Sequence, residues 1–578
     1  MTSKQKLELT WIGKDKAIKV EPRILVHDGT RDYGDKNTGN MLIYGDNLLA
    51  LKALEQEYAG KVKCIYIDPP YNTGSAFEHY DDNLEHSTWL SLMKPRLEIL
   101  RNLLADDGVI LVQIDANEMP YLKVLMDEIF NRCNFINIIS CKAKIAGVSG
   151  SHLGKSLQDN VEYILCYSKE ITKFNLYSIP QKTLELNKYI EDMESAGKSW
   201  KYTSVLQGLD QGTFLKSFLS GSGETISLYR HDNYQILSIQ EAARLFCNHD
   251  IKKAYYKFVN SIFRTTNAQT SIRQKVIEEI QGVEGELFSI EYAPSKGRNA
   301  GKKIRSYYKG NNLIAWLKDV VKVRDEHIYK LDNMGNLWDD VQYNNLTKEG
   351  EVQFPNGKKP EMLLQRILEM TTQPNDLVLD SFLGSGTTAA VAHKMGRKYI
   401  GIELGEHCHT HCIPRLQKVI DGTDQGGISK TIGWKGGGGF KYYYLAPSLL
   451  NKDKYGQYII SKEYNADMLA AAMAKHEGFL YSPDQDQFWK QGKSSENDYI
   501  YTTTNHVGAD VLAAIASEMK DGESLLVCCK SFDASIATQF SNITIKKIPG
   551  AILGSCEFAK DNYNLNIINP PAIDEEEE

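Results

Sequence analysis

The chain has 578 residues, a formal net charge of -7, 42% hydrophobic residues and 24% charged residues. This composition is ordinary for a globular protein of about three or four domains. No run of about 18 apolar residues and no apolar N-terminal segment occurs, so we expect neither a membrane span nor a secretory signal. The ten cysteines lack a disulfide-framework spacing, which favours a reducing cytoplasm.

Charge is unevenly distributed along the chain. Residues 171–330 contain 24 Lys and Arg against 17 Asp and Glu, a net of +7, so the remainder carries -14. Residues 425–578 contain 14 basic and 20 acidic residues. A basic middle segment between acidic ones suggests a polyanionic partner for the middle, although chance alone also produces such a pattern.

The first part of the chain alternates between strand and helix patterns. In order, we expect a strand and a helix within 40–57, a strand over 61–68, a helix over 87–108, a strand over 109–115 and a helix over 121–130. This alternation predicts βαβ units and a parallel sheet. The pattern breaks after about Lys144, and the residues up to 335 are rich in Tyr and Lys with Gly and Ser between them.

The strand and helix pattern returns later in the chain. Residues 376–404 predict a strand, a glycine loop, a helix and a strand, and 421–440 resemble a linker with a glycine-dense turn. A last α/β-like stretch contains a helix over 509–519 and a strand over 524–529. We therefore expect an α/β protein with a doubly wound sheet, divided into two halves of one domain, an insert and a C-terminal domain, at 1–144, 145–335, 336–424 and 425–578.

The glycine loop LDSFLGSGTT follows a strand and begins a helix. Gly384 and Gly386 let the backbone approach a ligand closely, and Glu403 ends the next strand, where an acid accepts hydrogen bonds from ribose hydroxyls. Ala389 stands where a dinucleotide site has its third glycine, and the loop lacks the lysine of an ATP-binding loop. S-adenosylmethionine fits, with Asp380 facing its cationic amino end. The alternative is a tight strand–helix turn without a ligand.

The segment CIYIDPPYNTG ends a buried-looking strand with a carboxylate, two prolines and a tyrosine. The exocyclic amine of a base is a weak nucleophile that needs two hydrogen-bond acceptors before it can be methylated. Asp68 can supply one, and the carbonyl of Pro69 or Pro70 the other, because proline removes competing N–H donors. Tyr71 offers a flat face for an extruded base. The alternative is a proline-stiffened turn that starts a helix.

The two segments support one another through topology. In a doubly wound sheet the ligand lies where the strand order reverses, over adjacent strands. If the strands before Asp68 and before the glycine loop are those neighbours, the methyl donor and the base meet at their carboxyl ends. The catalytic strand then precedes the cofactor strand by about 300 residues.

The order of the motifs resembles that of the permuted β class of DNA amino-methyltransferases. DPPY comes first, a long insert follows, and NGKKPEMLLQRILEMTTQPNDLVLDSFLGSGTT comes last. Five further segments resemble parts of the modification subunits of type III restriction systems. They are MLIYGDNLLALKAL, QIDANEMPYLKVLMDEIF, NLWDDV, FPNGKKP and GGISKTIGWKGGGGFKYYYL. The resemblance implies a circularly permuted Rossmann-like sheet with an inserted target-recognition domain. The site residues that it implies are Asp68, Pro69, Pro70 and Tyr71 for catalysis, and Asp46, Asp380, Phe382, Gly384, Ser385, Gly386, Thr387 and Glu403 for S-adenosylmethionine.

Two of these positions carry a finer expectation from the resemblance. Asp46 should lie near the adenine of the cofactor, and Phe382 beside its methionine end. Leu383 departs from the family, in which alanine is commoner, so we expect it to narrow the cofactor pocket.

The implied activity is methylation of N6 of a flipped adenine in double-stranded DNA, with S-adenosylhomocysteine as product and no metal. N4-cytosine methylation needs the same geometry, but that class more often has Ser before Pro-Pro, so Asp68 favours adenine. A DNA-binding specificity or assembly subunit of a restriction-modification complex is the other alternative. We expect a bacterial cytoplasmic protein held at the nucleoid through DNA. The sequence allows a homodimer or a restriction-subunit partner but requires neither.

The insert carries the expected DNA contacts. Residues 292–310 interleave basic groups with tyrosines, which suits phosphate neutralisation, although a solvated surface loop has the same composition. The residues that we expect to contact DNA are Lys296, Arg298, Lys302, Lys303, Arg305 and Tyr307. Amides that could contact adenine edges are Gln207, Gln211, Asn267, Gln269 and Gln274, and the sequence does not choose among them.

The run HCHTHC places His407 with His411, and Cys408 with Cys412, four residues apart, as in a metal site. It follows the Glu403 strand, where the fold needs a helix. Zinc ligands more often come from separated segments, so we expect a helix and no metal here.

Overall fold

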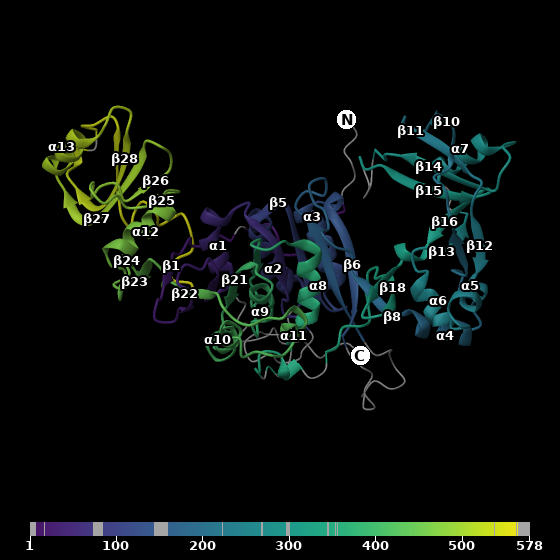
Figure 1. The fold of residues 1–578 in the computed structure, drawn as a ribbon. Coiled ribbons are helices and arrows are strands. Elements are labelled where there is room, and N and C mark those ends of the chain that lie inside the picture. The colour runs from purple at the N-terminus through teal and green to yellow at the C-terminus, as the bar shows by residue number, and fades with distance from the viewer. Residues whose placement is uncertain are drawn as a thin grey trace, which may run out of the picture. The chain divides into compact units, whose positions relative to one another are not determined.

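The structure is a computed structural model whose chain divides into two compact units, residues 1–179 with 335–578, and residues 180–334 (Figure 1). Each unit is described by itself. The structure describes residues 7–563 with the exception of 17, 73–84, 144–159, 222, 268–269, 296–300, 344–345, 353, 355–356, 537 and 562.

The first unit is built on an 11-stranded sheet with the strand order β1-β22-β3-β21-β20-β4-β5-β7-β6-β19, and β2 also pairs with β22. The strands from β22 to β5 are parallel, whereas β7 runs antiparallel to both β5 and β6. The strands are β1 (Leu25–His27), β2 (Tyr33–Gly34), β3 (Met41–Tyr44), β4 (Val62–Ile67), β5 (Leu104–Ile114), β6 (Phe135–Lys142), β7 (Val161–Ser168), β19 (Leu337–Trp338), β20 (Leu377–Asp380), β21 (Lys398–Glu403) and β22 (Gly439–Leu445).

Helices cover both faces of this sheet. Successive side chains of a strand point to opposite faces. Ile65 of β4 belongs to the core cluster formed with the first three helices, whereas the hydroxyl of Thr371 in α8 lies 3.4 Å from the sulfur of its neighbour Cys64. The helices are α1 (Asn47–Tyr58), α2 (His86–Leu103), α3 (Met119–Phe130), α8 (Glu361–Thr371), α9 (Thr387–Lys394), α10 (Ile413–Asp421) and α11 (Ser429–Ile432). The predicted doubly wound α/β fold is confirmed, including each strand and helix expected within 40–130 and 376–404.

The strand order reverses between β4 and β20. After β4 the chain continues to β5 on one side of the pair, and after β20 it continues to β21 on the other. Because ligands of open α/β sheets bind at the carboxyl ends of the strands where this reversal occurs, the fold itself points to the loops after β4 and β20.

The end of the chain contributes to the large sheet before it forms a smaller one. β22 pairs with β3 in parallel, so the C-terminal part leaves the large sheet only after Leu445, later than the expected boundary at 425. The remaining elements are β23 (Leu450–Lys452), β24 (Tyr458–Ile460), β25 (Leu480–Tyr481), β26 (Gly492–Lys493), β27 (Asp498–Val507), β28 (Ser524–Phe532), β29 (Ile543–Lys547), α12 (Ala466–His476) and α13 (Ala509–Glu518). Strands β25 to β29 form one five-stranded sheet in chain order.

The second unit is mainly antiparallel. Its eight-stranded sheet has the order β10-β11-β14-β15-β16-β13-β9-β12, and a three-stranded sheet has the order β17-β18-β8. Its elements are β8 (Gln181–Glu185), β9 (Ser204–Gln207), β10 (Thr213–Leu219), β11 (Thr225–His231), β12 (Gln235–Ser238), β13 (Ile262–Thr266), β14 (Leu287–Tyr292), β15 (Ile304–Lys309), β16 (Asn312–Trp316), β17 (Val321–Arg324), β18 (His327–Asn333), α4 (Leu186–Ser195), α5 (Ile239–Phe246), α6 (Ile251–Lys257) and α7 (Ser271–Ile280).

This unit begins at Pro180, not at the expected residue 145, because β7 pairs with β5 and β6 in the large sheet. In neither unit does a helix within the described ranges have the length and apolar character needed to cross a membrane.

Candidate active site

The DPPY segment and the glycine loop start from neighbouring strands. β4 ends at Ile67, directly before Asp68, and β20 ends at Asp380, directly before the glycine loop. The two strands pair in parallel, with Cys64 opposite Val378 and Ile65 opposite Leu379. The prediction that these strands are neighbours is confirmed, and both segments leave the sheet at the point where its strand order reverses.

The two oxygens of the Asp68 carboxylate differ. Oδ2 lies 2.6 Å from Nζ of Lys359, whereas Oδ1 is buried and has no hydrogen-bond partner among the described residues. Burial raises the pKa of Asp68, Lys359 opposes that rise, and the carboxylate of Glu162 adds to it. A buried acceptor without a donor costs about 1–3 kcal/mol, so Oδ1 is suited to receive an N–H group from a substrate.

Lys359 and Glu162 complete the surroundings of Asp68. The side chain of Lys359 is 8% exposed, its Nζ lies 3.9 Å from Oε2 of Glu162, and it also lies 5.0 Å from the centre of the Tyr71 ring. The Tyr71 hydroxyl donates a 3.0 Å hydrogen bond to Glu162. Neither residue was expected from the sequence, in which the adjacent lysines of FPNGKKP are the sole hint of a buried cation.

The two proline carbonyls of the segment are not equivalent. The indole N–H of Trp89, a residue of α2 that is 1% exposed, donates a 2.8 Å hydrogen bond to the carbonyl of Pro70. This bond fixes the segment against α2 and uses one of the two lone pairs of the Pro70 oxygen. Which proline carbonyl is the second acceptor for a base stays a prediction.

The two glycines of the loop have different surroundings. Both adopt positive φ angles, 57° at Gly384 and 80° at Gly386. A Cβ atom added at Gly384 would meet nothing closer than the Phe382 carbonyl oxygen at 4.0 Å, but one at Gly386 would lie 3.4 Å from Cα of Cys412. Gly384 thus leaves open space beside the backbone, whereas Gly386 lies in contact with Cys412 and is favoured there by its positive φ.

Two carboxyl groups flank the loop. Asp380 accepts hydrogen bonds from the Phe382 N–H at 2.9 Å and the Thr388 hydroxyl at 2.6 Å, and burial raises the pKa of Asp380 to about 7. Glu403 accepts from the Gly384 N–H at 2.6 Å through Oε2, while its Oε1 lies 2.9 Å from Nε2 of His407. A carboxylate oxygen has two lone pairs, so Oε2 keeps capacity for a ribose hydroxyl.

Asp46 is buried and engaged within the protein. It caps α1 by accepting a 3.1 Å hydrogen bond from the Leu49 N–H, and its other oxygen accepts a 3.0 Å bond from the Tyr563 N–H. Tyr563 shares a core cluster with Phe382, which is 7% exposed. Asp46 therefore contacts a segment from the end of the described chain.

Leu383 packs against the sheet. A Cβ atom added at Gly401 of β21 would lie only 2.7 Å from a methyl carbon of Leu383. The missing side chain at Gly401 makes room for this leucine, which is 4% exposed. The structure therefore assigns Leu383 to the core instead of the expected narrowing of the pocket.

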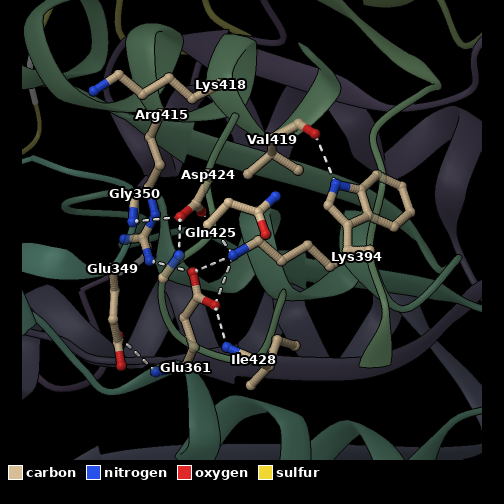
Figure 2. Close-up of polar contacts among 12 residues, drawn as sticks. Glu349, Gly350, Glu361, Lys394, Arg415, Lys418, Val419, Asp424, Gln425 and Ile428 are labelled. Atoms are coloured by element: carbon tan, nitrogen blue, oxygen red, sulfur yellow. Dashed lines mark hydrogen bonds and ion pairs between the residues drawn. The ribbon is translucent and has the colours of Figure 1, made fainter. Parts of the chain in front are cut away.

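Ser385 and Thr387 contact a buried cluster of charged side chains. The Arg415 guanidinium donates to the Ser385 carbonyl at 3.2 Å and to the Thr387 hydroxyl at 2.7 Å. Arg415 also pairs with Glu361 at 2.9 Å (Figure 2). Ser385 and Thr387 thus hold the glycine loop to α8 and α10, and their expected contact with the cofactor stays a prediction.

The HCHTHC run forms the expected helix. Residues Cys408–Cys412 are a π-helix that continues into α10. The Cys412 thiol lies 3.1 Å from the Gly384 carbonyl, burial raises the pKa of Cys408, and His407 pairs with Glu403. The run thus holds the glycine loop through Cys412 and Glu403 through His407.

The basic stretch of the second unit is only partly free to meet DNA. Lys296 and Arg298 lie outside the described residues. Lys303 pairs with Glu291 at 2.6 Å, Arg305 pairs with it at 3.3 Å, and Lys302 is exposed. The Tyr307 ring packs against Trp316 at a centroid distance of 5.6 Å.

The candidate amides that would contact bases are not distinguished by the structure. Gln269 lies outside the described residues, and Asn267 accepts a 3.4 Å hydrogen bond from Arg273. The others in the described part of the chain are Gln207, Gln211 and Gln274.

Comparison with known proteins supports a single family. A family model described as DNA methylase matches residues 62–413, which include both the DPPY segment and the glycine loop. The chain is 50% identical over 414 residues to the probable type III restriction-modification enzyme HindVI Mod subunit of Haemophilus influenzae, covering 71% of this chain and 54% of that protein. It is 28% identical over 452 residues to the EcoPI Mod subunit of Escherichia phage P1, covering 69% and 62%. It spans little more than half the length of these relatives. The chain belongs to the DNA methylase family.

Proposed function

We propose that the protein methylates N6 of an adenine flipped out of double-stranded DNA, with S-adenosylmethionine as methyl donor. The observation that carries this proposal is Oδ1 of Asp68, which is buried without a hydrogen-bond partner among the described residues, at the carboxyl end of β4 beside the glycine loop. An acceptor in that state suits an amino group that must lose its hydrogen bonds to water before it reacts.

The residues at the end of β4 divide the work of holding the base. Asp68 Oδ1 accepts one N6–H, and the carbonyl of Pro69 or Pro70 accepts the other. These two acceptors draw the nitrogen lone pair out of the ring plane and aim it toward the glycine loop. Tyr71 stacks on the base, and its hydrogen bond to Glu162 fixes the plane of its ring.

The loop after β20 has the donor and acceptor set that S-adenosylmethionine requires. The cofactor supplies a methyl group activated on a sulfonium. Gly384 leaves the backbone open to approach, Glu403 can accept from ribose hydroxyls, and Asp380 can pair with the amino group of the methionine part. Asp46 accepts one hydrogen bond on each oxygen within the protein, so a bond to the adenine would use a second lone pair of one oxygen.

The proposed partner is double-stranded DNA, contacted in part through Lys302, Lys303 and Arg305 of the second unit, with Lys296 and Arg298 added from the sequence. The names of the relatives describe subunits of restriction-modification enzymes. We propose a restriction subunit or a second copy of this chain as a further partner, although methyl transfer itself requires neither. We also propose a bacterial cytoplasmic location, because the proposed substrate is DNA.

The test is transfer of a tritiated methyl group from S-adenosylmethionine to double-stranded DNA by the purified full chain. Nucleosides from the product, separated by mass spectrometry, are expected to contain N6-methyladenine. N4-methylcytosine would replace the adenine assignment by the cytosine alternative. Binding of DNA without methyl transfer, with cofactor and partner present, would favour a specificity or assembly subunit.

A further inference from the structure

Lys359 is a buried cation that reaches the catalytic carboxylate from a distant part of the chain. Its Nζ lies 2.6 Å from Asp68 Oδ2, and its side chain is 8% exposed. The next carboxylate among the described residues is that of Glu162, at 3.9 Å. A contact of 2.6 Å within a buried site is a charge-assisted hydrogen bond, which fixes the orientation of the carboxylate as well as its charge. Lys359 therefore determines which oxygen of Asp68 is left for a substrate.

The segment that carries Lys359 is held on both sides. On one side, Lys358 Nζ donates to the carbonyls of Glu349 at 2.5 Å and Val352 at 3.0 Å. On the other side, Glu361 begins α8, and its side chain pairs with Lys394 at 2.8 Å and Arg415 at 2.9 Å (Figure 2). Because both neighbours are anchored, the position of Lys359 does not depend on its bond to Asp68.

The same anchor reaches the glycine loop. Arg415 bonds to Glu361 and, through its other terminal nitrogen, to Ser385 and Thr387 of the loop. One short stretch, residues 358–361, thus connects the loop after β20 with the carboxylate after β4.

Burial and the carboxyl groups of Glu162 on β7 and Asp380 on β20 disfavour the charge of Asp68, whereas the Tyr71 hydroxyl favours it. Tyr66 on β4 and Tyr343 are neutral neighbours. Burial acts to lower the pKa of Lys359, but Asp68 and Glu162 outweigh it and the pKa is raised, so the side chain remains an ammonium. Among the described residues, Lys359 is the cation that pairs with Asp68.

We propose that Lys359 is a positioning residue for methyl transfer: it keeps Asp68 ionised and turned so that Oδ1 accepts an N–H of the target amine. A protonated Asp68 would present a donor where the amine needs an acceptor. The inference rests on the proposed function, because it assigns to Lys359 the task of preparing the acceptor used there.

The test is the pH profile of kcat in Lys359→Met and Lys359→Gln, both without charge, and in Lys359→Arg, which keeps it. An opposite charge within about 4–6 Å lowers a carboxyl pKa by about 1–3 units, so the acid limb of the profile should move up by that amount in the two neutral variants. Their deficit should therefore be larger on the acid limb than at pH 9, where Asp68 is ionised in every variant. The arginine variant should keep the wild-type limb.

Lys490→Met is the matched control. Lys490 pairs with Glu523 at 2.7 Å in the C-terminal sheet, and its side chain is 9% exposed, so its loss removes a similar buried pair away from the site. This variant should melt at a lower temperature and keep the wild-type pH profile. If Lys359→Met does not fold, Lys359→Gln, which keeps a hydrogen-bond donor, provides the same measurement.

A deficit that is equal at every pH, or wild-type activity in both neutral variants, would overturn the proposal for Lys359. Absence of methyl transfer by the wild-type chain would instead count against the proposed function. The two failures are therefore distinguished by the wild-type measurement.

Discussion

Asp68 and Glu361 are two carboxylates of the same unit that each pair with a lysine, and they use their oxygens differently. In Glu361, Oε1 contacts Lys394 and Arg415, and Oε2 contacts Lys394 and the Ile428 N–H. In Asp68, Oδ2 contacts Lys359 and Oδ1 has no partner within the described residues. Full pairing suits a carboxylate that holds the scaffold, whereas incomplete pairing suits one that receives a substrate.

The comparison also explains why the two sites differ in composition. Breaking a buried ion pair leaves an uncompensated charge, so several cations around each anion stabilise a cluster that holds the scaffold. Lys394 pairs with Asp424 at 2.7 Å as well as with Glu361 (Figure 2). A site that must accept a new hydrogen bond cannot be saturated in this way. Substitutions around Asp68 should therefore change the rate of methyl transfer, whereas substitutions around Glu361 should change the free energy of unfolding.

Asp68→Asn should produce the largest functional effect. The amide keeps the shape of the side chain but loses the charge and one acceptor, so we expect kcat to fall by at least about 100-fold. Cofactor binding measured by calorimetry should stay within about threefold of wild type, because Asp68 addresses the base. Tritium incorporation close to the wild-type rate would remove Asp68 from its assigned role.

Glu361→Gln should produce the largest effect on stability. Removal of one partner from a buried pair costs about 3–5 kcal/mol, and the retained contact of Lys394 with Asp424 places the expected loss of unfolding free energy near about 3 kcal/mol. Denaturant titration measures this loss. Glu369→Gln, an exposed position on the same helix, is the control and should change the free energy by less than about 0.5 kcal/mol. Equal results for the two variants would show that the Glu361 cluster does not support the fold.

Cofactor affinity should depend on pH through Asp380. Its carboxyl has a pKa of about 7 in the free protein because it is buried, and a bound cation favours the ionised form. Affinity for S-adenosylmethionine should therefore be constant above pH 7 and fall by about tenfold for each unit below it, with proton release on binding in that range. Calorimetry in two buffers of different ionisation enthalpy measures the proton. Asp380→Asn should flatten the dependence, and an unchanged slope in that variant would assign the proton to another group.

The smallest expected effects concern DNA, where Glu291 already neutralises part of the basic stretch. Lys302→Ala should reduce the salt dependence of DNA binding by about one unit of slope, as expected for one lost phosphate contact. Lys303→Ala should have less effect because Glu291 offsets its charge. Glu291→Gln should strengthen DNA binding by freeing Lys303 and Arg305. If all three variants bind as wild type at several salt concentrations, the stretch faces solvent.

The sequence predicted those parts of the site that depend on local patterns. Buried strands followed by Asp68 and by the glycine loop are visible in the chain, and the doubly wound topology was enough to pair them. The pairing partners of Asp68 were not predictable in this way. Lys359 and Glu162 lie far from Asp68 in the sequence, and a lysine pair such as Lys358 and Lys359 does not distinguish a buried ion pair from solvated side chains.

The domain limits were missed for a related reason. β7 and β22 belong to the large sheet although each follows a segment without a regular pattern. Their membership depends on pairing with β5 and β3, which are distant in the chain. Local propensity identifies a strand but does not name its neighbour.

The permuted strand order has a consequence for synthesis of the protein. β4 ends at Ile67 and its neighbour β20 begins at Leu377, 310 residues later. At about 5–20 residues per second, a ribosome needs roughly 15–60 s to make that stretch. During this time the nascent chain carries the DPPY segment on a sheet that lacks its central neighbour, and contacts of such large sequence separation form slowly. A ribosome-bound chain that stops before Leu377 should therefore bind no cofactor, because the strand that carries the glycine loop has not yet been made.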